Sequence, residues 1–279
     1  MALALALGGA AHAQWSIGPA GARQASPGQN HYLYLVAADP LPGLEQAFND
    51  AYQNQHMGDL VQLEGWTGAQ RFRLATDGQP RTAVQGARYG YLIVFDQEGA
   101  SPPALFVGGK NRRIPGFDYA TPGASWQATY KVLGPKRRRP DGRSPFMPAA
   151  SDLNTPRLNR YVLMEFDDLP AGVKAADFEA ALDRRIGQVL TLPGWMAAQR
   201  LRLEPTPPAT GRAPRAAEPA DQYLTLWETE GRSAVEVQGA LLAATKAGKV
   251  EALTRDAATA ESTYWLPISP YITKDDFER

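Results

Sequence analysis

Cysteine is absent from the 279 residues of this chain. Its absence excludes disulfide bonds, a thiolate nucleophile and any metal site built from cysteine ligands. Histidine is scarce as well, with only His12, His31 and His56. Because His12 lies in a predicted leader and His31 opens a predicted strand, one histidine remains near the candidate pocket described below. We therefore expect no metal site and no cofactor.

Net charge and long apolar runs are also missing. The chain has 29 basic and 29 acidic residues, whereas a nucleic-acid-binding protein normally carries a basic patch or stripe. No run of about 20 apolar residues occurs, so no membrane span is expected. The sequence contains neither a nucleotide-phosphate loop nor a plausible serine triad. We expect a small molecule as the partner, with no nucleic acid and no membrane span.

The first residues, MALALALGGAAHAQ, are apolar and then small. The Ala-x-Ala pattern at 11–13 is typical of the end of a secretory signal, with cleavage before Gln14. This predicts a signal peptide over 1–13 and a periplasmic or secreted protein. The basic residues that usually open such a segment are missing, so the signal is expected to be truncated. A frayed N-terminal segment is the alternative.

What the chain does contain is an internal repeat. LEGWTGAQRFRL at 63–74 returns as LPGWMAAQRLRL at 192–203. Three further pairs recur in the same order, namely 31–43 with 160–172, 91–99 with 223–231, and 129–135 with 263–270. Such self-similarity predicts a duplicated domain. We expect the first, site-bearing repeat over 28–135, a proline-rich basic linker over 136–157, and the second repeat over 158–272.

Each repeat is predicted to run strand, helix, strand, strand, helix, strand. The strands are short apolar runs, and SAVE at 233–236 predicts a capped helix start in the second repeat. This order is that of the ferredoxin-like βαββαβ unit, whose sheet leaves one apolar face uncovered. The expected fold class is therefore α+β, with tandem ferredoxin-like repeats packed face to face as an intramolecular α/β barrel. A barrel of about eight strands can enclose one small ligand, and a monomer with internal pseudo-twofold symmetry is expected.

The first predicted helix carries the most ordered polar pattern. At about 100° per residue, Tyr52, His56 and Asp59 share a stripe with Phe48 and Leu63, so they should face the sheet. A histidine there can act as general acid or base. Asp59 could orient the ring and favour its charged form, and Tyr52 could donate to a developing oxyanion. A buried, hydrogen-bonded trio with a structural role is the alternative.

Two arginines alternate along the strand that follows. Arg71 and Arg73 share one face of it. In the barrel interior, such an arginine would bind an acidic or enolate-like substrate, and toward solvent both would be surface charges. The second repeat keeps them as Arg200 and Arg202, which favours a structural role.

The segment over 107–126 contains glycines and prolines that break the helix expected at this point. A loop carrying Arg113 and Tyr119 beside the histidine-bearing half predicts a lid, and loss of the helix without a role is the alternative. With Trp66 and Arg71, these two residues form the expected substrate-binding set.

The pattern FNxxYxxxH at 48–56, with Asp59 and GWTGAQRF after it, resembles the dimeric α/β-barrel superfamily and, within it, EthD-like proteins. The resemblance covers both repeats. It places Asn49, Tyr52, His56 and Asp59 at the EthD-like helix positions, with Gly58 where a proline is usual. Members include cofactor-free monooxygenases, polyketide cyclases, lactone isomerases and haem enzymes, so the resemblance leaves haem ligation by the histidine open. Fold analogy alone does not choose among them.

The second repeat lacks this polar set. Aligned on the repeated Gly-Trp pair, His56 meets Arg185, and aligned on Phe48 and Phe178 it meets Ile186. Either way the histidine is replaced. We therefore expect the first repeat to carry the site and the second to complete the barrel.

These observations favour an exported, cofactor-independent acid/base enzyme of lyase, isomerase or cyclase type. Its substrate would be a small, apolar, carbonyl- or phenol-bearing compound. The expected catalytic residues are His56, Tyr52, Asp59 and Asn49. A non-catalytic periplasmic small-molecule binding protein and a cofactor-free monooxygenase are the alternatives.

Overall fold

A computed structural model describes seven ranges of the chain: 29–76, 89–102, 114–118, 125–140, 159–204, 222–254 and 261–277. The predicted signal peptide, Arg113 and Tyr119 lie outside these ranges, as does most of the predicted linker. Within them, no helix is long and apolar enough to cross a membrane.

The first half of the barrel matches the predicted strand, helix, strand, strand order. Its elements are β1 (Asn30–Ala38), α1 (Glu45–Ala51), a π-helical turn η2 (Tyr52–His56), α2 (Met57–Val61), β2 (Trp66–Leu74), β3 (Tyr91–Gly99) and β4 (Ser125–Val132). The helix begins after a turn in which Gly43 has a φ of 78°. A positive φ is open to glycine without steric cost, which explains the residue at this point.

The second half has the complete predicted order. Its elements are β6 (Asn159–Asp167), α3 (Ala175–Val189), β7 (Trp195–Glu204), β8 (Tyr223–Gly231), α4 (Ala234–Lys246) and β9 (Glu261–Pro267). As predicted, Ser233 caps α4, and its hydroxyl accepts the backbone N–H of Glu236 at 3.2 Å. The Glu236 carboxylate accepts the backbone N–H of Arg232 at 2.6 Å, which satisfies a further donor at this helix start.

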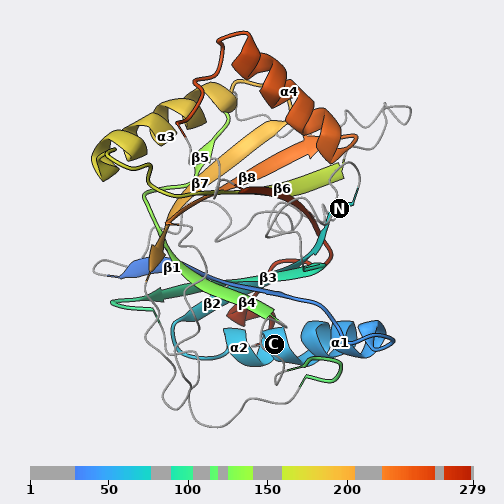
Figure 1. The fold of residues 1–279 in the computed structure, drawn as a ribbon. Coiled ribbons are helices and arrows are strands. Elements are labelled where there is room, and N and C mark those ends of the chain that lie inside the picture. Colours follow the sequence, from blue (N-terminus) through green and yellow to red (C-terminus); the bar gives the residue numbers. More distant parts are fainter. Residues whose placement is uncertain are drawn as a thin grey trace, which may run out of the picture.

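Eight of the strands form a closed barrel in the order β2-β3-β1-β4-β7-β8-β6-β9, and β9 pairs with β2 to close it. Neighbouring strands are antiparallel throughout. The halves join where β4 meets β7 and where β2 meets β9. Figure 1 shows two curved layers of strands, with α3 and α4 on one outer side and α1 and α2 on the other. The molecule is thus an α+β, eight-stranded antiparallel barrel.

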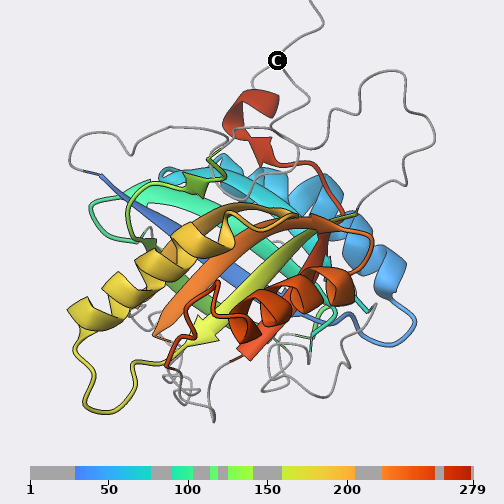
Figure 2. The ribbon, with the colours of Figure 1, turned by 90° about the horizontal axis from the view of Figure 1, so that it is seen from above.

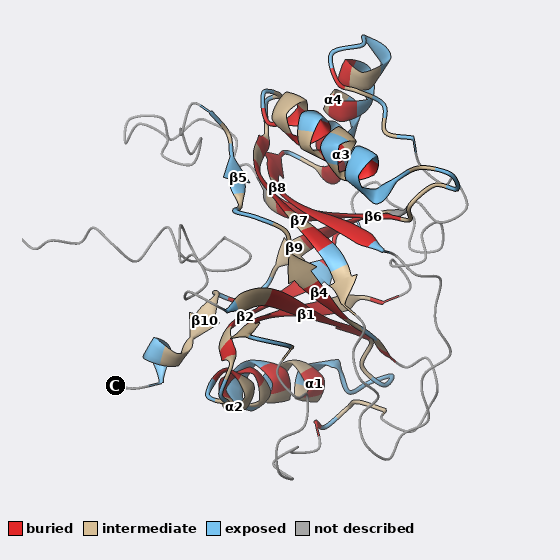
Figure 3. Ribbon diagram, turned by 90° about the vertical axis from the view of Figure 1, so that its left-hand side faces the viewer, coloured by how far each residue is buried: buried red, intermediate tan, exposed pale blue. Residues whose placement is uncertain are grey.

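Apolar side chains from both halves fill the space between the layers. They include Leu33, Val94, Phe72, Met164, Phe166, Leu226 and Trp265. These side chains are almost entirely buried, and the strand segments that carry them are coloured as buried in Figure 3. None of the four predicted catalytic residues belongs to this interior cluster.

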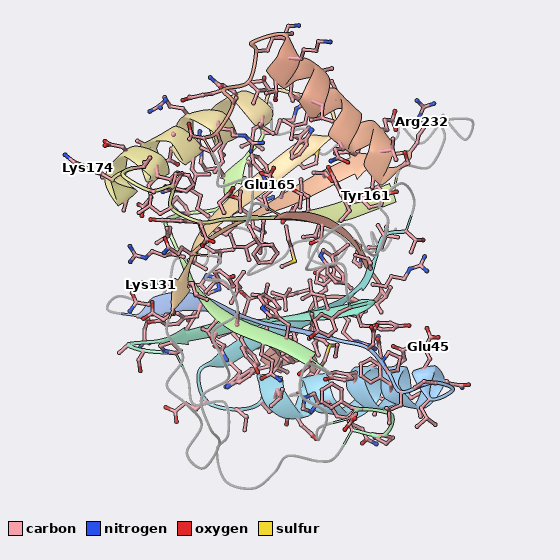
Figure 4. All side chains as sticks on the ribbon, viewed as in Figure 1. Glu45, Lys131, Tyr161, Glu165, Lys174 and Arg232 are labelled. Atoms are coloured by element: carbon pink, nitrogen blue, oxygen red, sulfur yellow. The ribbon has the colours of Figure 1, made fainter. Side chains whose placement is uncertain are left out.

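A second apolar layer lies between the helices and the outer face of each half. In the first half it contains Val36, Phe48, Tyr52, Trp66 and Phe95, and in the second Leu163, Ile186, Trp195 and Trp227. Figure 4 shows Tyr161 and Glu165 in the second of these layers, on the side of the strands that faces α3 and α4. The predicted polar site belongs to the helix-facing layer of the first half and not to the barrel interior.

The chain after β4 runs along the second half. Leu133 donates its N–H to the carbonyl of Arg200 at 2.9 Å, and the short strand β5 (Arg137–Arg138) pairs with β7. Lys136 forms an ion pair with Glu228 at 2.5 Å. The segment predicted as a linker therefore begins with a short paired strand over 137–138, where β7 has an edge that β4 does not occupy.

The chain after β9 runs along the first half in the same manner. We call residues 268–277 the C-terminal strap. It contains β10 (Ile272–Thr273), which pairs with β2, and the 3-10 turn η4 (Lys274–Asp276). In Figure 2 this red C-terminal turn lies beside the blue helices of the first half, away from α3 and α4.

Candidate functional site

The helix that carries the predicted catalytic residues contains a single π-helical turn, η2. The chain from Phe48 to Trp66 is one residue longer than the chain from Phe178 to Trp195 in the second half. A π turn closes on i+5 and not on i+4, so it takes up one extra residue within a helix. In the second half, α3 is α-helical throughout. The alignment of the two halves on Phe48 and Phe178 therefore applies before η2, and the alignment on the Gly-Trp pair applies after it.

His56 ends this π turn and is partly buried. Its ring meets the ring of Tyr52 edge-on, with centroids 5.1 Å apart. Burial lowers the pKa of His56 to about 4, and the charge of Asp59 opposes only part of that shift. The imidazole is therefore neutral at pH 7. The effect of Asp59 has the predicted sign, but loss of hydration outweighs it, and the described residues show no hydrogen bond between the two side chains.

Arg71 lies under the first turns of the helix and is 1% exposed. Its Nη1 donates to the carbonyl of Asn49 at 3.1 Å, and its Nη2 donates to Oδ1 of Asn49 at 2.6 Å. The rings of Phe48, Tyr52 and Tyr91 surround the guanidinium, with centroids 5.2–5.8 Å from its central carbon. The side chain therefore occupies neither of the two predicted places, since it lies between sheet and helix. Arg73, by contrast, is exposed.

No carboxylate of the described residues forms an ion pair with Arg71, whose Nε is buried without a hydrogen-bond partner there. The nearby Tyr91 hydroxyl donates to the carboxylate of Glu45, which Figure 4 labels beside α1. Burial lowers the pKa of Arg71, and Tyr52 and Tyr91 oppose this effect. A guanidinium nevertheless keeps its proton in proteins. Among the described residues, the first half thus buries a positive charge without the anion that normally accompanies one.

The second half compensates the corresponding arginine. Arg200 lies as far after Trp195 as Arg71 lies after Trp66. It donates to the carbonyl of Glu179 at 3.4 Å and pairs with the carboxylate of Asp183 at 3.2 Å. Each arginine thus donates to a backbone carbonyl of the helix that covers it, but among the described residues only Arg200 has a carboxylate partner.

The sequence explains this difference. Asn49 follows Phe48 as Glu179 follows Phe178, and Gln53 stands where Asp183 does. These two acidic residues of α3 are therefore replaced by amides in the first helix, while the arginine of the strand is retained.

Arg185 occupies the place of His56 when the halves are compared from the Gly-Trp turn. Its Nη1 and Nη2 donate to the two oxygens of Glu165 at 2.9 and 3.3 Å, and Trp227 Nε1 donates to the same carboxylate at 2.6 Å. Val36 stands on β1 where Glu165 stands on β6. The second half therefore holds a complete buried ion pair where the first half holds a neutral histidine.

Trp66, predicted to bind substrate, is fully buried and packs edge-on against Tyr34 and Phe95. Its Nε1 has no hydrogen-bond partner among the described residues, and neither amide atom of its neighbour Gln97 has one. The helix-facing layer of the first half therefore contains several donors without acceptors, including Nε of Arg71. Gln97 could not be singled out from the sequence, because one amide in an apolar strand forms no pattern.

The predicted lid is described only over 114–118. There Ile114 is buried, and the ring of Phe117 stacks on that of Phe48 with centroids 6.3 Å apart. The carbonyl of Gly116 accepts the N–H of Leu41 at 2.8 Å. This part of the segment thus packs against the start of the helix, beside the aromatic rings around Arg71.

A second polar group at the end of β3 was not predicted. Asp96 is fully buried, and its Oδ1 lies 2.7 Å from Nε2 of His31. Its Oδ2 accepts the hydroxyl of Tyr271 at 2.6 Å. The partners lie 65 and 175 residues from Asp96 along the chain, so no local pattern could connect them.

The described residues contain no group of three His, Cys, Asp or Glu side chains that could hold a metal ion. The expectations of no metal and no cofactor remain predictions from the sequence.

No family model matches this chain, and no curated protein matches it. Solved structures do match. One is an anthrone oxidase-like protein, with a TM-score of 0.48 and 13% identity over 88% of this chain and 93% of that one. A provisionally assigned monooxygenase from Fusobacterium nucleatum matches with a TM-score of 0.44 and 9% identity, over 86% of this chain and 94% of that one. Another such protein, from Lactobacillus acidophilus, matches with a TM-score of 0.38 and 10% identity, over 88% of this chain and 97% of that one. At these scores and identities, none of them assigns a reaction or a ligand to this chain.

Proposed function

We propose that the helix-facing layer of the first half binds a small, largely apolar compound through an acidic oxygen and moves a proton on it. The substrate would be a carbonyl compound that forms an enolate, or a phenol, and the reaction an isomerisation, elimination or cyclisation. The observation that carries this proposal is the buried Arg71, which has no carboxylate partner in the described structure.

The energetic reason is the imbalance between the two halves. An uncompensated buried charge costs several kcal/mol, roughly 3–5 where one partner of a buried pair is removed. In the second half, Arg200 is only partly buried and also pairs with the exposed Asp183, so it bears less of this cost. In the first half, a ligand oxyanion would supply the missing negative charge, and the planar guanidinium suits such an oxygen. The surrounding rings would hold the apolar part of the ligand.

His56 supplies the second requirement, a group that can accept a proton. With its pKa lowered to about 4, the imidazole is in its basic form throughout the neutral range. A proton taken from the substrate would leave negative charge on the substrate oxygen, where Arg71 stabilises it. Return of that proton to another atom completes an isomerisation.

The contacts of the neighbouring residues support the following roles. Asn49 accepts hydrogen bonds from Arg71 through both its carbonyl and its side chain, which supports a positioning role for it. Tyr52 flanks both Arg71 and His56 and would contact the bound compound. Asp59 would modulate the charge of His56 from a distance.

Binding can be tested with a charge series on one shape: benzoate, neutral benzamide and cationic benzamidine. Benzoate should raise the melting temperature of the protein and the other two should not. 4-Nitrophenol should bind as its coloured phenolate. Arg71→Met should abolish both effects, whereas Arg200→Met, the matched control, should keep them. Benzoate binding to Arg71→Met as strong as to the native chain would reject the site.

Proton transfer can be tested separately, by following the exchange of α-protons of small aryl ketones in D₂O by NMR. His56→Gln should lose exchange but keep benzoate binding. Binding without exchange for any such compound would favour the non-catalytic binding protein. A product that forms only in air would favour cofactor-free oxygenation at the same residues.

We further propose that the two halves are copies of one ferredoxin-like unit, EthD-like in type, and that the protein is a monomer exported to the periplasm or beyond. The recurring segments support the duplication, and the Ala-x-Ala pattern at 11–13 supports export. Expressed with its natural upstream sequence, the mature protein should begin at or near Gln14. An intact N-terminus in a cytoplasmic fraction would reject export.

A further inference from the structure

The C-terminal strap, although it follows the second half in sequence, is bonded to the site-bearing strand of the first half. Ile268 donates its N–H to the carbonyl of Arg71 at 3.0 Å. The hydroxyl of Ser269 accepts the N–H of Arg71 at 2.9 Å, and the carbonyl of Ser269 accepts Nε2 of Gln70 at 3.2 Å. The strap therefore holds the backbone of Arg71 at both its donor and its acceptor.

Two further contacts anchor the strap. Tyr271 donates to the buried Asp96 at 2.6 Å and lies directly over Gly68. A Cβ at that glycine would overlap the tyrosine hydroxyl, so only glycine leaves room for this contact. Farther along, the ring of Phe277 covers Gly58, where a Cβ would lie 2.9 Å from Cε1 of the ring. This second contact is two residues from His56.

The second half shows which of these contacts are particular to the site. The carbonyl of Arg200 accepts the N–H of Leu133 just as that of Arg71 accepts the N–H of Ile268. The next residue, however, is Gly134, which has no hydroxyl to offer, where the strap has Ser269. The carbonyl contact is common to both halves, and the serine contact exists only beside the uncompensated arginine.

The anchors differ in the same way. Where Tyr271 donates to Asp96, Lys136 forms an ion pair with Glu228. The anchor of the strap is thus a hydrogen bond from an uncharged tyrosine hydroxyl to a carboxylate, whose other oxygen lies against His31. The second half uses a charged pair for the same mechanical purpose.

We propose that the C-terminal strap is a positioning element for Arg71, in which Ser269 fixes the strand at Arg71 and the Tyr271–Asp96–His31 group fixes Ser269. A binding group must be held within about 0.5 Å of its productive place. In the described part of the chain, the guanidinium of Arg71 contacts Asn49 and three ring faces but no carboxylate, so a fixed backbone adds to its positioning. Such preorganisation reduces the entropy lost on binding. This inference rests on the proposed function, because it takes Arg71 as the ligand-binding group.

The test uses the full chain with benzoate as the probe. Ser269→Ala removes the acceptor of the Arg71 N–H and should weaken benzoate binding about 3- to 10-fold, the range expected for one hydrogen bond. Ser269→Thr keeps a hydroxyl and should restore most of the affinity. Tyr271→Phe should weaken binding in the same direction. The matched control Lys136→Met removes the anchor of the other half and should leave benzoate affinity unchanged.

A ligand-free readout separates this inference from the proposed function. The Nε–H signal of Arg71 in an NMR spectrum should shift or broaden in Ser269→Ala and Tyr271→Phe, but not in Lys136→Met. If the native chain does not bind benzoate, the proposed function fails, and this signal alone decides the positioning role. A lower melting temperature with unchanged benzoate affinity and an unchanged Arg71 signal would overturn the proposal, since the strap would then be only a structural brace.

Discussion

Lowering the pH from about 7 to about 4.5 is expected to destabilise the protein through His56. Burial lowers the pKa of this residue from 6.5 to about 4 in the folded chain. A base with a lowered folded pKa contributes stability that is fully present above its unfolded pKa. That contribution is lost as the pH falls through 6.5 toward 4, because only the unfolded chain takes up the proton. At pH 4.5, most of this contribution to stability is already lost.

The magnitude follows from the same shift. One pKa unit corresponds to about 1.4 kcal/mol, so the loss in the free energy of unfolding should approach about 2.5 kcal/mol at pH 4.5. Urea unfolding of the native chain and of His56→Gln at both pH values isolates the contribution of His56 to this loss, because glutamine stays neutral. The native chain should lose about 2.5 kcal/mol more than the variant between the two pH values. Equal losses would show that His56 is not held neutral by burial, and its proposed role as a base would lose its support.

Three further predictions concern other buried groups. Burial raises the pKa of Glu230 from 4.5 to about 7, so this carboxyl lowers stability as the pH rises through that range. Glu230→Gln should therefore stabilise the protein by about 2–3 kcal/mol in urea unfolding at pH 8, and no gain would contradict this. Arg185→Ala should cost about 3–5 kcal/mol, because Glu165 loses its buried partner, and a cost below about 1 kcal/mol would refute the ion pair. Gly68→Ala should displace Tyr271, and protection of strap amides from hydrogen exchange should fall sharply, whereas native-like protection would contradict the packing.

Much of the fold follows from local sequence patterns. Short apolar runs located the barrel strands, and Ser233 with Glu236 located the start of α4. The direction of Tyr52 was also predictable, since its buried ring lies against Arg71 of the sheet. These features depend on neighbours within a few residues, which a sequence displays directly. The short strands β5 and β10 were not predictable, because they form only where another half offers a strand edge.

The environment of Arg71 was beyond the reach of periodicity. A β-bulge between Trp66 and Gly68 shifts the register of β2 against β3. In a regular strand, side chains alternate between the two faces, so Trp66 and Arg71 would lie on opposite faces. The bulge instead places Trp66 and Arg71 on the same, helix-facing side. The absence of a counter-ion became visible only by comparison with Arg200. The group around Asp96 joins residues distant in sequence, which only the closed barrel brings together.

The central claim is that Arg71 is left without a counter-ion so that a ligand oxyanion can take that place. Asn49→Asp tests it most directly, because the change is nearly isosteric and puts a carboxylate 2.6 Å from Nη2 of Arg71. The measurement is benzoate affinity by calorimetry, with the ligand-free melting temperature alongside and Asn49→Ser as the uncharged control. We expect the ligand-free protein to be stabilised by about 1 kcal/mol, as a neutral hydrogen bond becomes a charged one. Benzoate affinity should fall at least about tenfold, because the protein then supplies its own anion. Native benzoate affinity in Asn49→Asp, with no gain in stability, would contradict the claim.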